Sequence, residues 1–270
     1  MTKSMPPQIE AFLEMIAAER GATKNTLDAY ARDLADYVAE LARAGKAPHN
    51  AATGDIRAYL SKVAERGLKP ASSARKLSSI RQFHRFLVAD GRRTDDPALI
   101  VEAPRSGRRL PKMLSVAEAG HLLAVSKEGL DDDARPAPER LRALRTACLL
   151  EVLYATGLRV SELVTLPASA AHTKEPFIRI RGKGGRERLA PLPGEARRTI
   201  SAYRGFLKKN LEGTPGLWLF PADSASGHLT RQAFARDLKT SAAAAGIAAA
   251  RISPHLLRHA FASHLLQNGA

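Results

Sequence analysis

The clearest strand pattern in this chain is a pair of alternating segments around a glycine-rich turn. Apolar and polar residues alternate over Phe177–Arg181 and again over Arg186–Ala190, and Gly182-Lys183-Gly184-Gly185 lies between them. Alternation at a period of two on both sides of a glycine turn predicts an antiparallel β-hairpin with Lys183 at its tip. Most of the remaining chain has the apolar spacing of helices. The sequence therefore predicts a mainly α protein with one small β element.

The first hundred residues predict helices, and no strand pattern competes with them. Asn25 is a candidate cap of the second helix, and Thr53 and Asp55 open the third. Glycines follow the first three apolar stripes and are natural helix ends. We expect a four-helix N-terminal domain over residues 1–104, with helices at about residues 7–21, 25–45, 53–67 and 71–89.

A second domain is expected after a linker at residues 105–113, which is rich in proline, glycine and basic residues. Ser115 and Glu118 have the spacing of a capping box, so this domain begins near residue 114 and extends to 270. A long helix from about Glu139 ends at Gly157, and Arg159 opens a short helix directly after that end. Ser253 is expected to cap the last helix. This second domain is mixed α/β because it contains the hairpin.

The charge of the chain indicates a polyanionic partner. Lys and Arg number 42 against 27 Asp and Glu, giving a net charge of +15, and nucleic acid is the simplest partner for such a chain. The single cysteine, Cys148, excludes an internal disulfide and a cysteine-rich metal site, and it suits a reducing cytoplasm. The sequence has neither a signal-peptide pattern at Met1–Glu10 nor a run of 18 apolar residues, so a cytoplasmic protein is expected.

Four residues form a candidate site for a phosphate: Arg159, Lys183, His255 and Arg258. Guanidinium groups suit bidentate contact with phosphate oxygens, Lys183 is a mobile point charge, and histidine moves protons near neutral pH. Each residue also has a plainer interpretation. Arg159 can simply pair with Glu162 on the helix surface, Lys183 can be an ordinary turn lysine, and His-x-x-Arg is a common pattern. His259 and His264 are interpreted as packing or surface histidines.

The fourth helix has a basic face that is a candidate for contact with a DNA backbone. Small hydroxyl residues beside arginines allow a helix to approach a phosphodiester closely. The alternative is an ordinary solvated face. With the basic hairpin included, the predicted DNA-contacting residues are Ser72, Ser73, Arg75, Lys76, Arg81, Arg181 and Arg186.

Taken together, Ala155–Leu163, the Lys183 turn and His255-Leu256-Leu257-Arg258 resemble the catalytic domain of the tyrosine recombinases, the phage integrase family. The Ser-Ser-Ala-Arg-Lys-Leu-Ser stretch of the fourth helix resembles the Xer branch, and its XerD type most closely. The resemblance implies a SAM-like helical domain and a catalytic domain that close around DNA as a C-shaped clamp. It also implies catalytic roles for Arg159, Lys183, His255 and Arg258, with Glu162 orienting Arg159.

The family signature continues with a His or Trp and then a nucleophilic tyrosine, and neither follows Arg258 at the family's position in these 270 residues. All five tyrosines precede His255. We therefore expect the chain as given, which resembles a recombinase cut off before its nucleophile, to bind DNA without forming a covalent adduct. For the intact enzyme, the resemblance implies cutting and rejoining of DNA through a 3′-phosphotyrosyl link, with no cofactor and no metal.

The resemblance also implies a double-stranded recombination site, a sister XerC-like recombinase in a heterotetramer, and control by a DNA translocase. Chromosome dimer resolution is the expected role. Three alternatives stay open: the integrase of a mobile element, a DNA-binding or architectural protein without catalysis, and a basic RNA-binding protein. The last does not explain the spaced Arg, Lys and His-x-x-Arg.

Overall fold

The computed structural model describes residues 5–103, 114–172, 175–182, 187–210 and 216–267. Backbone contacts divide the chain into an N-terminal unit, Met1–Arg109, and a C-terminal unit, Leu110–Ala270. Each unit has its own hydrophobic core. No helix in the described part of the chain is long and apolar enough to span a membrane.

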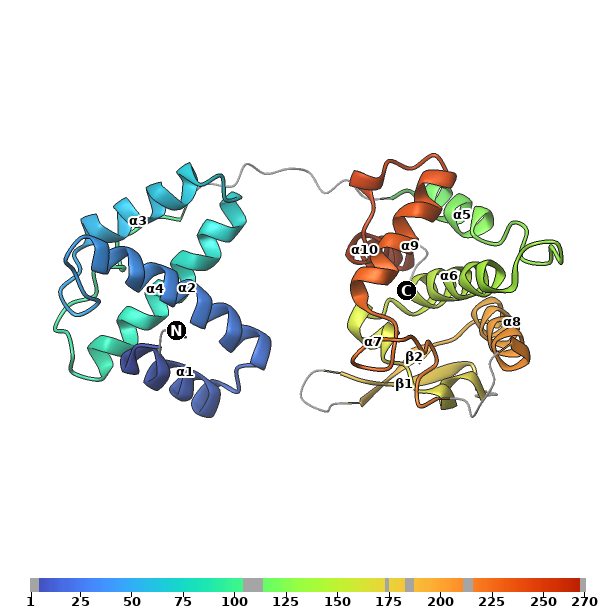
Figure 1. Cartoon of the computed structure of the whole chain (residues 1–270), viewed down its shortest axis with the longest axis horizontal. Coiled ribbons are helices and arrows are strands. Elements are labelled where there is room, and N and C mark those ends of the chain that lie inside the picture. Colours follow the sequence, from blue (N-terminus) through green and yellow to red (C-terminus); the bar gives the residue numbers. More distant parts are fainter. Residues whose placement is uncertain (1–4, 104–113, 173–174, 183–186, 211–215, 268–270) are drawn as a thin grey trace. The chain divides into compact units, whose positions relative to one another are not determined.

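The N-terminal unit consists of four helices, as the sequence predicts. They are α1 (Pro7–Arg20), α2 (Lys24–Arg43), α3 (Thr53–Glu65) and α4 (Pro70–Ala89) (Figure 1). Their apolar faces meet around aromatic residues, with Phe12 of α1 packed edge-on against Phe83 of α4. The prediction that Asn25 caps the second helix was wrong. Thr23 is the extended residue before α2, and Asn25 lies inside the first turn of that helix.

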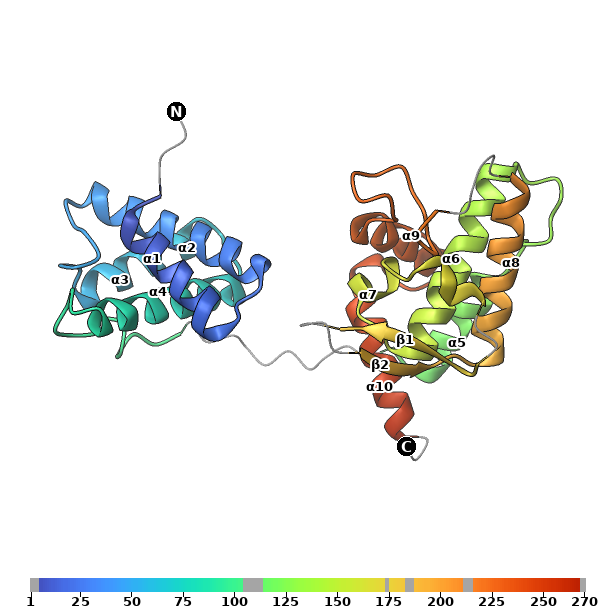
Figure 2. The same cartoon turned by 90° about the horizontal axis from the view of Figure 1, so that it is seen from below.

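The C-terminal unit is built around α6 (Ala137–Thr156), in which every residue from Thr146 to Leu153 is buried. A helix that is covered on all sides must be the centre of its domain. It lies alongside α8 (Gly194–Asn210) in both views, and it also contacts α10 (Pro254–Gln267) (Figures 1 and 2). The other helices are α5 (Val116–Val125), α7 (Val160–Val164), α9 (Arg231–Ala244) and the 3-10 turns η1 (Ala168–His172) and η3 (Ala249–Arg251).

The predicted hairpin is present as β1 (Phe177–Arg181) paired antiparallel with β2 (Glu187–Pro191). Ile180 stands opposite Arg188, and Ile178 stands opposite Ala190. Both isoleucines and Ala190 are buried, so this face of the hairpin packs on the core. The mainly α prediction with a small antiparallel sheet is therefore confirmed.

Helix ends follow local sequence signals closely. Ser115 and Glu118 exchange the two hydrogen bonds of a capping box at the start of α5. The backbone N–H of Leu256 donates to the Ser253 hydroxyl at the start of α10. Gly157 ends α6 with a positive φ of 58°, a conformation that glycine adopts without strain. The chain is thereby turned so that Arg159 begins α7.

Candidate active site

Arg159 lies at the N-terminus of α7, where its backbone is extended rather than helical. Its backbone N–H donates to Glu162 Oε2 at 2.8 Å, and its side-chain Nη1 donates to Glu162 Oε1 at 3.1 Å. The guanidinium group remains mostly exposed, with 59% of the side chain accessible. The Arg159–Glu162 pair of the plainer interpretation is therefore present, and it leaves the outer edge of the guanidinium group open.

Glu162 is the centre of the site because three arginines converge on its carboxylate. Its side chain is only 6% exposed. Besides Arg159, Arg188 of β2 donates from Nη2 to Oε2 at 2.8 Å, and Arg258 Nη1 of α10 lies 4.0 Å from the same oxygen. Burial raises the pKa of Glu162, but the hydrogen bonds from Arg159 and the charges of Arg188 and Arg159 outweigh this and lower the pKa below its ordinary value. The carboxylate therefore stays ionised at neutral pH.

Arg258 has a buried donor that nothing in the described part of the chain satisfies. Its Nη1 atom is enclosed but has no hydrogen-bond partner. Burial, then the positive charges of Arg159 and Arg188, lower the pKa of Arg258, and the negative charge of Glu162 opposes them. An arginine nevertheless stays protonated. A buried cationic N–H without an acceptor is costly, so this atom marks a place where an anion oxygen would be strongly stabilised.

His255 is exposed in the first turn of α10, one turn before Arg258 on the same helix. Its Nε2 lies 2.8 Å from Nε2 of His259, and the two rings meet edge to face with centroids 4.2 Å apart. His259 was expected to be a packing or surface residue, and it is exposed, but its ring contacts the candidate catalytic histidine. His264 is a packing residue, since it bridges the Tyr154 hydroxyl and the carbonyl of Leu114.

The hairpin residues divide into those that the structure describes and those that it does not. Lys183 and Arg186 lie outside the described residues. Arg181 is exposed at the end of β1. It lines a groove of about 490 Å³ between the hairpin and the segment after α7, together with Glu162, Arg179, Phe177 and Leu189. The groove therefore opens beside the arginine cluster.

Arg188 is the member of the arginine cluster that sequence reasoning missed. It lies two residues before the buried Ala190 and opposite the buried Ile180, so it occupies the core-facing side of β2. A charged residue at a core-facing position of an alternating strand needs a buried partner, and this was the available signal. The partner, Glu162, is 26 residues away in the sequence.

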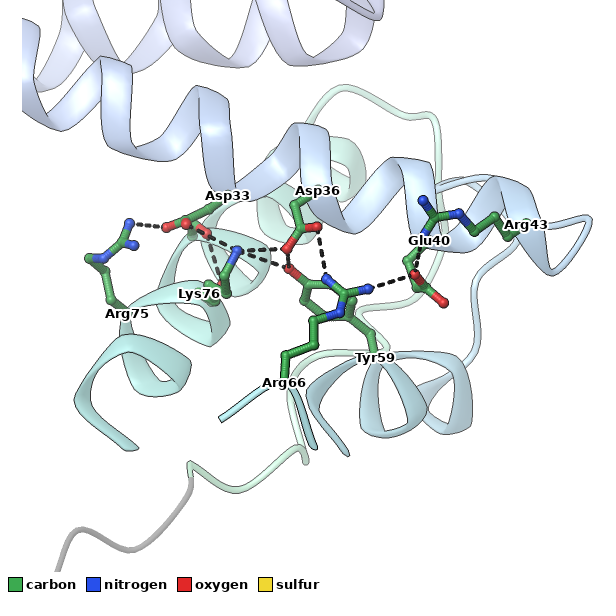
Figure 3. A network of polar contacts seen from close by, with 9 residues as sticks. Asp33, Asp36, Glu40, Arg43, Tyr59, Arg66, Arg75 and Lys76 are labelled. Carbon is green, nitrogen blue, oxygen red and sulfur yellow. Dashed lines mark hydrogen bonds and ion pairs between the residues drawn. The ribbon is translucent and has the colours of Figure 1, made fainter. Parts of the chain in front are cut away.

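Most of the predicted DNA-contacting residues of α4 are used inside the N-terminal unit. Asp33, Asp36 and Glu40 form an acidic stripe on α2 that faces basic residues of α3 and α4 (Figure 3). Lys76 donates to Asp36 at 2.8 Å and lies 3.4 Å from Asp33, and Arg75 pairs with Asp33. The stripe also accepts hydrogen bonds from four further residues, Arg43, Tyr59, Lys62 and Arg66.

Exposure separates the α4 residues further. Ser73 and Lys76 are buried, Ser72 is half-buried, and Arg81 donates to the carbonyl of Val101. A lysine whose ammonium already faces two carboxylates has little charge left for a phosphate. By contrast, Lys69 and Arg85 are exposed and have no side-chain partner among the described residues. The predicted contacts of Ser73 and Lys76 with DNA remain predictions, and this packing does not favour them.

A metal site is not formed by the described residues, because no group of three His, Cys, Asp or Glu side chains among them could hold an ion. The chemistry that the site offers is that of cations around an anion. Two arginines from separate segments, Arg159 and Arg258, lie beside the same Glu162 carboxylate, and His255 stands one turn before Arg258 on α10. This arrangement suits electrostatic stabilisation of a phosphate and of the additional charge that develops during its transfer.

Comparisons with known proteins identify the family of the chain. Residues 114–270 match the phage integrase family, and residues 9–91 match the phage integrase N-terminal SAM-like domain. The chain is 51% identical over 274 residues to the tyrosine recombinase XerD of Rhizobium meliloti (strain 1021), covering 100% of this chain and 85% of that protein. It is also 51% identical over 271 residues to the XerD of Brucella suis biovar 1 (strain 1330), covering 100% and 87%.

Solved structures share the fold. The post-cleavage complex of the XerH site-specific recombinase with a palindromic difH substrate is 20% identical with a TM-score of 0.70, covering 95% of this chain and 73% of that one. Lambda integrase (residues 75–356) bound to DNA is 18% identical with a TM-score of 0.68, covering 97% and 86%.

The family matches over both units thus define an enzyme of DNA recombination, and the chain belongs to the phage integrase family. Within that family it is a XerD-like tyrosine recombinase, that is, a tyrosine-type site-specific recombinase.

Proposed function

We propose that Arg159 and Arg258 hold the scissile phosphate of a DNA recombination site, with His255 and Lys183 as the proton-handling groups. The observation that carries this proposal is the buried, unpartnered Nη1 of Arg258 next to the Glu162 carboxylate that orients Arg159. Two guanidinium groups on the non-bridging oxygens would offset the charge of the pentacoordinate transition state. Removing one such positioned donor lowers the rate about 10²–10³-fold.

The proposed reaction is a transesterification that conserves the phosphodiester bond. A tyrosine hydroxyl attacks the phosphorus and forms a 3′-phosphotyrosyl bond, the P–O5′ bond breaks, and the 5′-oxygen leaves. His255 assists removal of the phenolic proton, and Lys183 gives a proton to the leaving 5′-oxygen. The 5′-hydroxyl of the partner strand then attacks the phosphotyrosyl bond and releases the tyrosine. No ATP is consumed because one ester replaces another.

We further propose that the 270 residues alone bind DNA without forming the covalent adduct. None of their five tyrosines is available to the site. Tyr37, Tyr59 and Tyr203 are buried, Tyr30 accepts a hydrogen bond from Gln82 in the N-terminal unit, and Tyr154 is bonded to His264.

The proposed domain organisation is a helical DNA-binding domain at 1–104, a linker at 105–113 and a catalytic domain at 114–270, and both domains are proposed to contact duplex DNA. The DNA-facing residues proposed for it are Ser72, Arg75, Arg81, Arg181 and Arg186, to which the exposed side chains add Lys69 and Arg85. The net charge of +15 supports this contact with DNA.

The proposed cellular role is resolution of chromosome dimers in the cytoplasm, in a heterotetramer with a sister recombinase and under control of a DNA translocase. Similarity to the XerD proteins of Rhizobium meliloti and Brucella suis over the whole chain supports this role over integration of a mobile element.

The test begins with selection of bound fragments from chromosomal DNA of the source organism, which identifies the site. A duplex of that site with a nick beside the scissile phosphate is then incubated with the 270-residue chain and with the protein isolated from the source organism. We expect a covalent protein–DNA band from the second only. Such a band from the 270-residue chain would refute its proposed lack of a nucleophile.

The matched variant is Arg258→Lys. It keeps the charge but removes the bidentate fork. We expect it to leave duplex affinity nearly intact and to abolish strand cleavage in the native protein. If no protein form cleaves the selected site, the chain acts as a DNA binder without catalysis.

A further inference from the structure

The Glu162 carboxylate already accepts three hydrogen bonds from Arg159 and Arg188, which occupy most of its accepting capacity. Oε1 accepts from Arg159 Nη1, and Oε2 accepts from both the Arg159 backbone N–H and Arg188 Nη2, each at 2.8 Å. Arg258 Nη1 stops at 4.0 Å from Oε2, beyond hydrogen-bond distance. The third arginine is therefore held beside the carboxylate without being bonded to it.

This difference of about 1 Å decides what Arg258 does. An arginine bonded to a buried carboxylate is a structural ion pair whose donors are satisfied. An arginine kept just out of bonding range has an enclosed donor with no partner, and a phosphate oxygen can satisfy it. Arg188 Nη2 is bonded to Oε2, the same carboxylate oxygen that lies 4.0 Å from Arg258 Nη1.

From this geometry we infer that Arg188 is a positioning residue for phosphate binding by Arg159 and Arg258. Its hydrogen bond fills the accepting capacity of Glu162 Oε2 and so keeps the Nη1 donor of Arg258 free for the scissile phosphate. The inference rests on the function proposed above. Arg188 also fastens β2 to the N-terminus of α7, since one hydrogen bond joins the hairpin to the residue that orients Arg159. Its loss would let Arg258 close onto Glu162 and become unavailable.

A direct role for Arg188 is the competing explanation, because 40% of its side chain is exposed. The two roles differ in what happens when Glu162 is changed. If Arg188 acts through the carboxylate, replacing Glu162 removes the effect of replacing Arg188. If Arg188 touches the phosphate itself, the two losses add.

The experiment follows inorganic phosphate binding to the 270-residue chain through the ¹⁵N–¹H side-chain resonance of Arg258, which reports on this site alone. Arg188→Ala is compared with Arg179→Ala. Arg179 is the matched control because it is a hairpin arginine of equal charge that pairs with Glu187 across the strands and does not bond Glu162. We expect Arg188→Ala to weaken phosphate binding about five- to tenfold, and Arg179→Ala to change it less than about twofold.

Two further variants separate positioning from folding and from direct contact. Arg188→Lys, which can still donate one N–H to Glu162, restores most of the binding. In a Glu162→Gln background, Arg188→Ala has no additional effect. Thermal melts establish that each variant is folded. If Arg188→Ala fails to fold, Arg188→Met takes its place, because Met keeps most of the side-chain length and cannot donate a hydrogen bond to Glu162.

The inference is overturned if Arg188→Ala binds phosphate like Arg179→Ala, or if its loss adds to that of Glu162→Gln. A different result identifies failure of the proposed function itself: the Arg258 resonance of the unmodified chain does not respond to phosphate although the chain binds duplex DNA. That result overturns both the proposed phosphate binding by Arg159 and Arg258 and the role of Arg188.

Discussion

Gly157→Ala tests whether the junction between α6 and α7 holds the two arginine-bearing segments in register. Gly157 has a φ of 58°, and a methyl group added there would lie 2.4 Å from Cδ1 and 2.5 Å from Cε1 of the Phe261 ring. Phe261 belongs to α10, the helix that carries His255 and Arg258. One glycine therefore sets both the direction of the chain into Arg159 and its closeness to α10.

Two separate penalties give the expected size of the effect. A non-glycine residue in the left-handed region costs about 1–2 kcal/mol. Forcing extra volume into a packed contact costs about 1–3 kcal/mol. The free energy of unfolding of the C-terminal unit should therefore fall by about 2–5 kcal/mol.

Gly246→Ala is the matched control, because Gly246 has a φ of +70° in the same unit and an added methyl group meets nothing within 4 Å. It should show only the backbone penalty. Urea unfolding followed by the fluorescence of Trp218, the single tryptophan of the chain, reports on the C-terminal unit. Phe261→Leu in the Gly157→Ala background should recover part of the loss. Equal destabilisation by Gly157→Ala and Gly246→Ala would falsify the argument from the Phe261 contact.

Three further outcomes follow from buried groups. Burial is the main cause that lowers the pKa of His84 to about 4. Between about pH 6.5 and 4 the unfolded chain therefore binds a proton at His84 that the folded chain does not, so acidification over this range should lower the free energy of unfolding by up to about 3 kcal/mol. His84→Gln should make the free energy of unfolding depend less on pH, measured by urea titrations at several pH values. Lys76→Met should lower the free energy of unfolding by about 3 kcal/mol, because it removes a cation that Asp33 and Asp36 share. Arg85→Ala should leave the melting temperature unchanged and reduce the dependence of log affinity for DNA on log salt concentration by about 1. Equal melting temperatures of the two variants would contradict the distinction between a structural Lys76 and a free Arg85. Cys148 is fully buried, and burial raises the pKa of its thiol, so Ellman's reagent should label it only after unfolding, and rapid labelling of the native chain would contradict its place in the core.

Local signals in the sequence were enough to determine most of the secondary structure. Helix ends coincide with residues whose own chemistry ends or begins a helix, such as Gly157 with its left-handed backbone and the Ser115–Glu118 capping box. The hairpin follows from alternation around a glycine turn. These features were predictable because each depends on residues within a few positions of one another.

The candidate site was predictable only in part. Arg159, Glu162 and Arg258 were identified through motif resemblance, and the structure brings these three together. The sequence did not indicate that the Glu162 carboxylate is shared between Arg159 and Arg188. The hydrogen bond from Arg188 joins a strand to a helix residue 26 positions away.

The basic face of α4 shows the same limit in the N-terminal unit. In the sequence, Arg75 and Lys76 belong to one basic stripe. In the structure, their charges are opposed by Asp33 and Asp36, about 40 residues earlier on α2. The charge of a side chain is a property of the sequence, but whether that charge is available to a ligand depends on which opposite charge the fold brings within hydrogen-bond distance. Only the tertiary structure decides that.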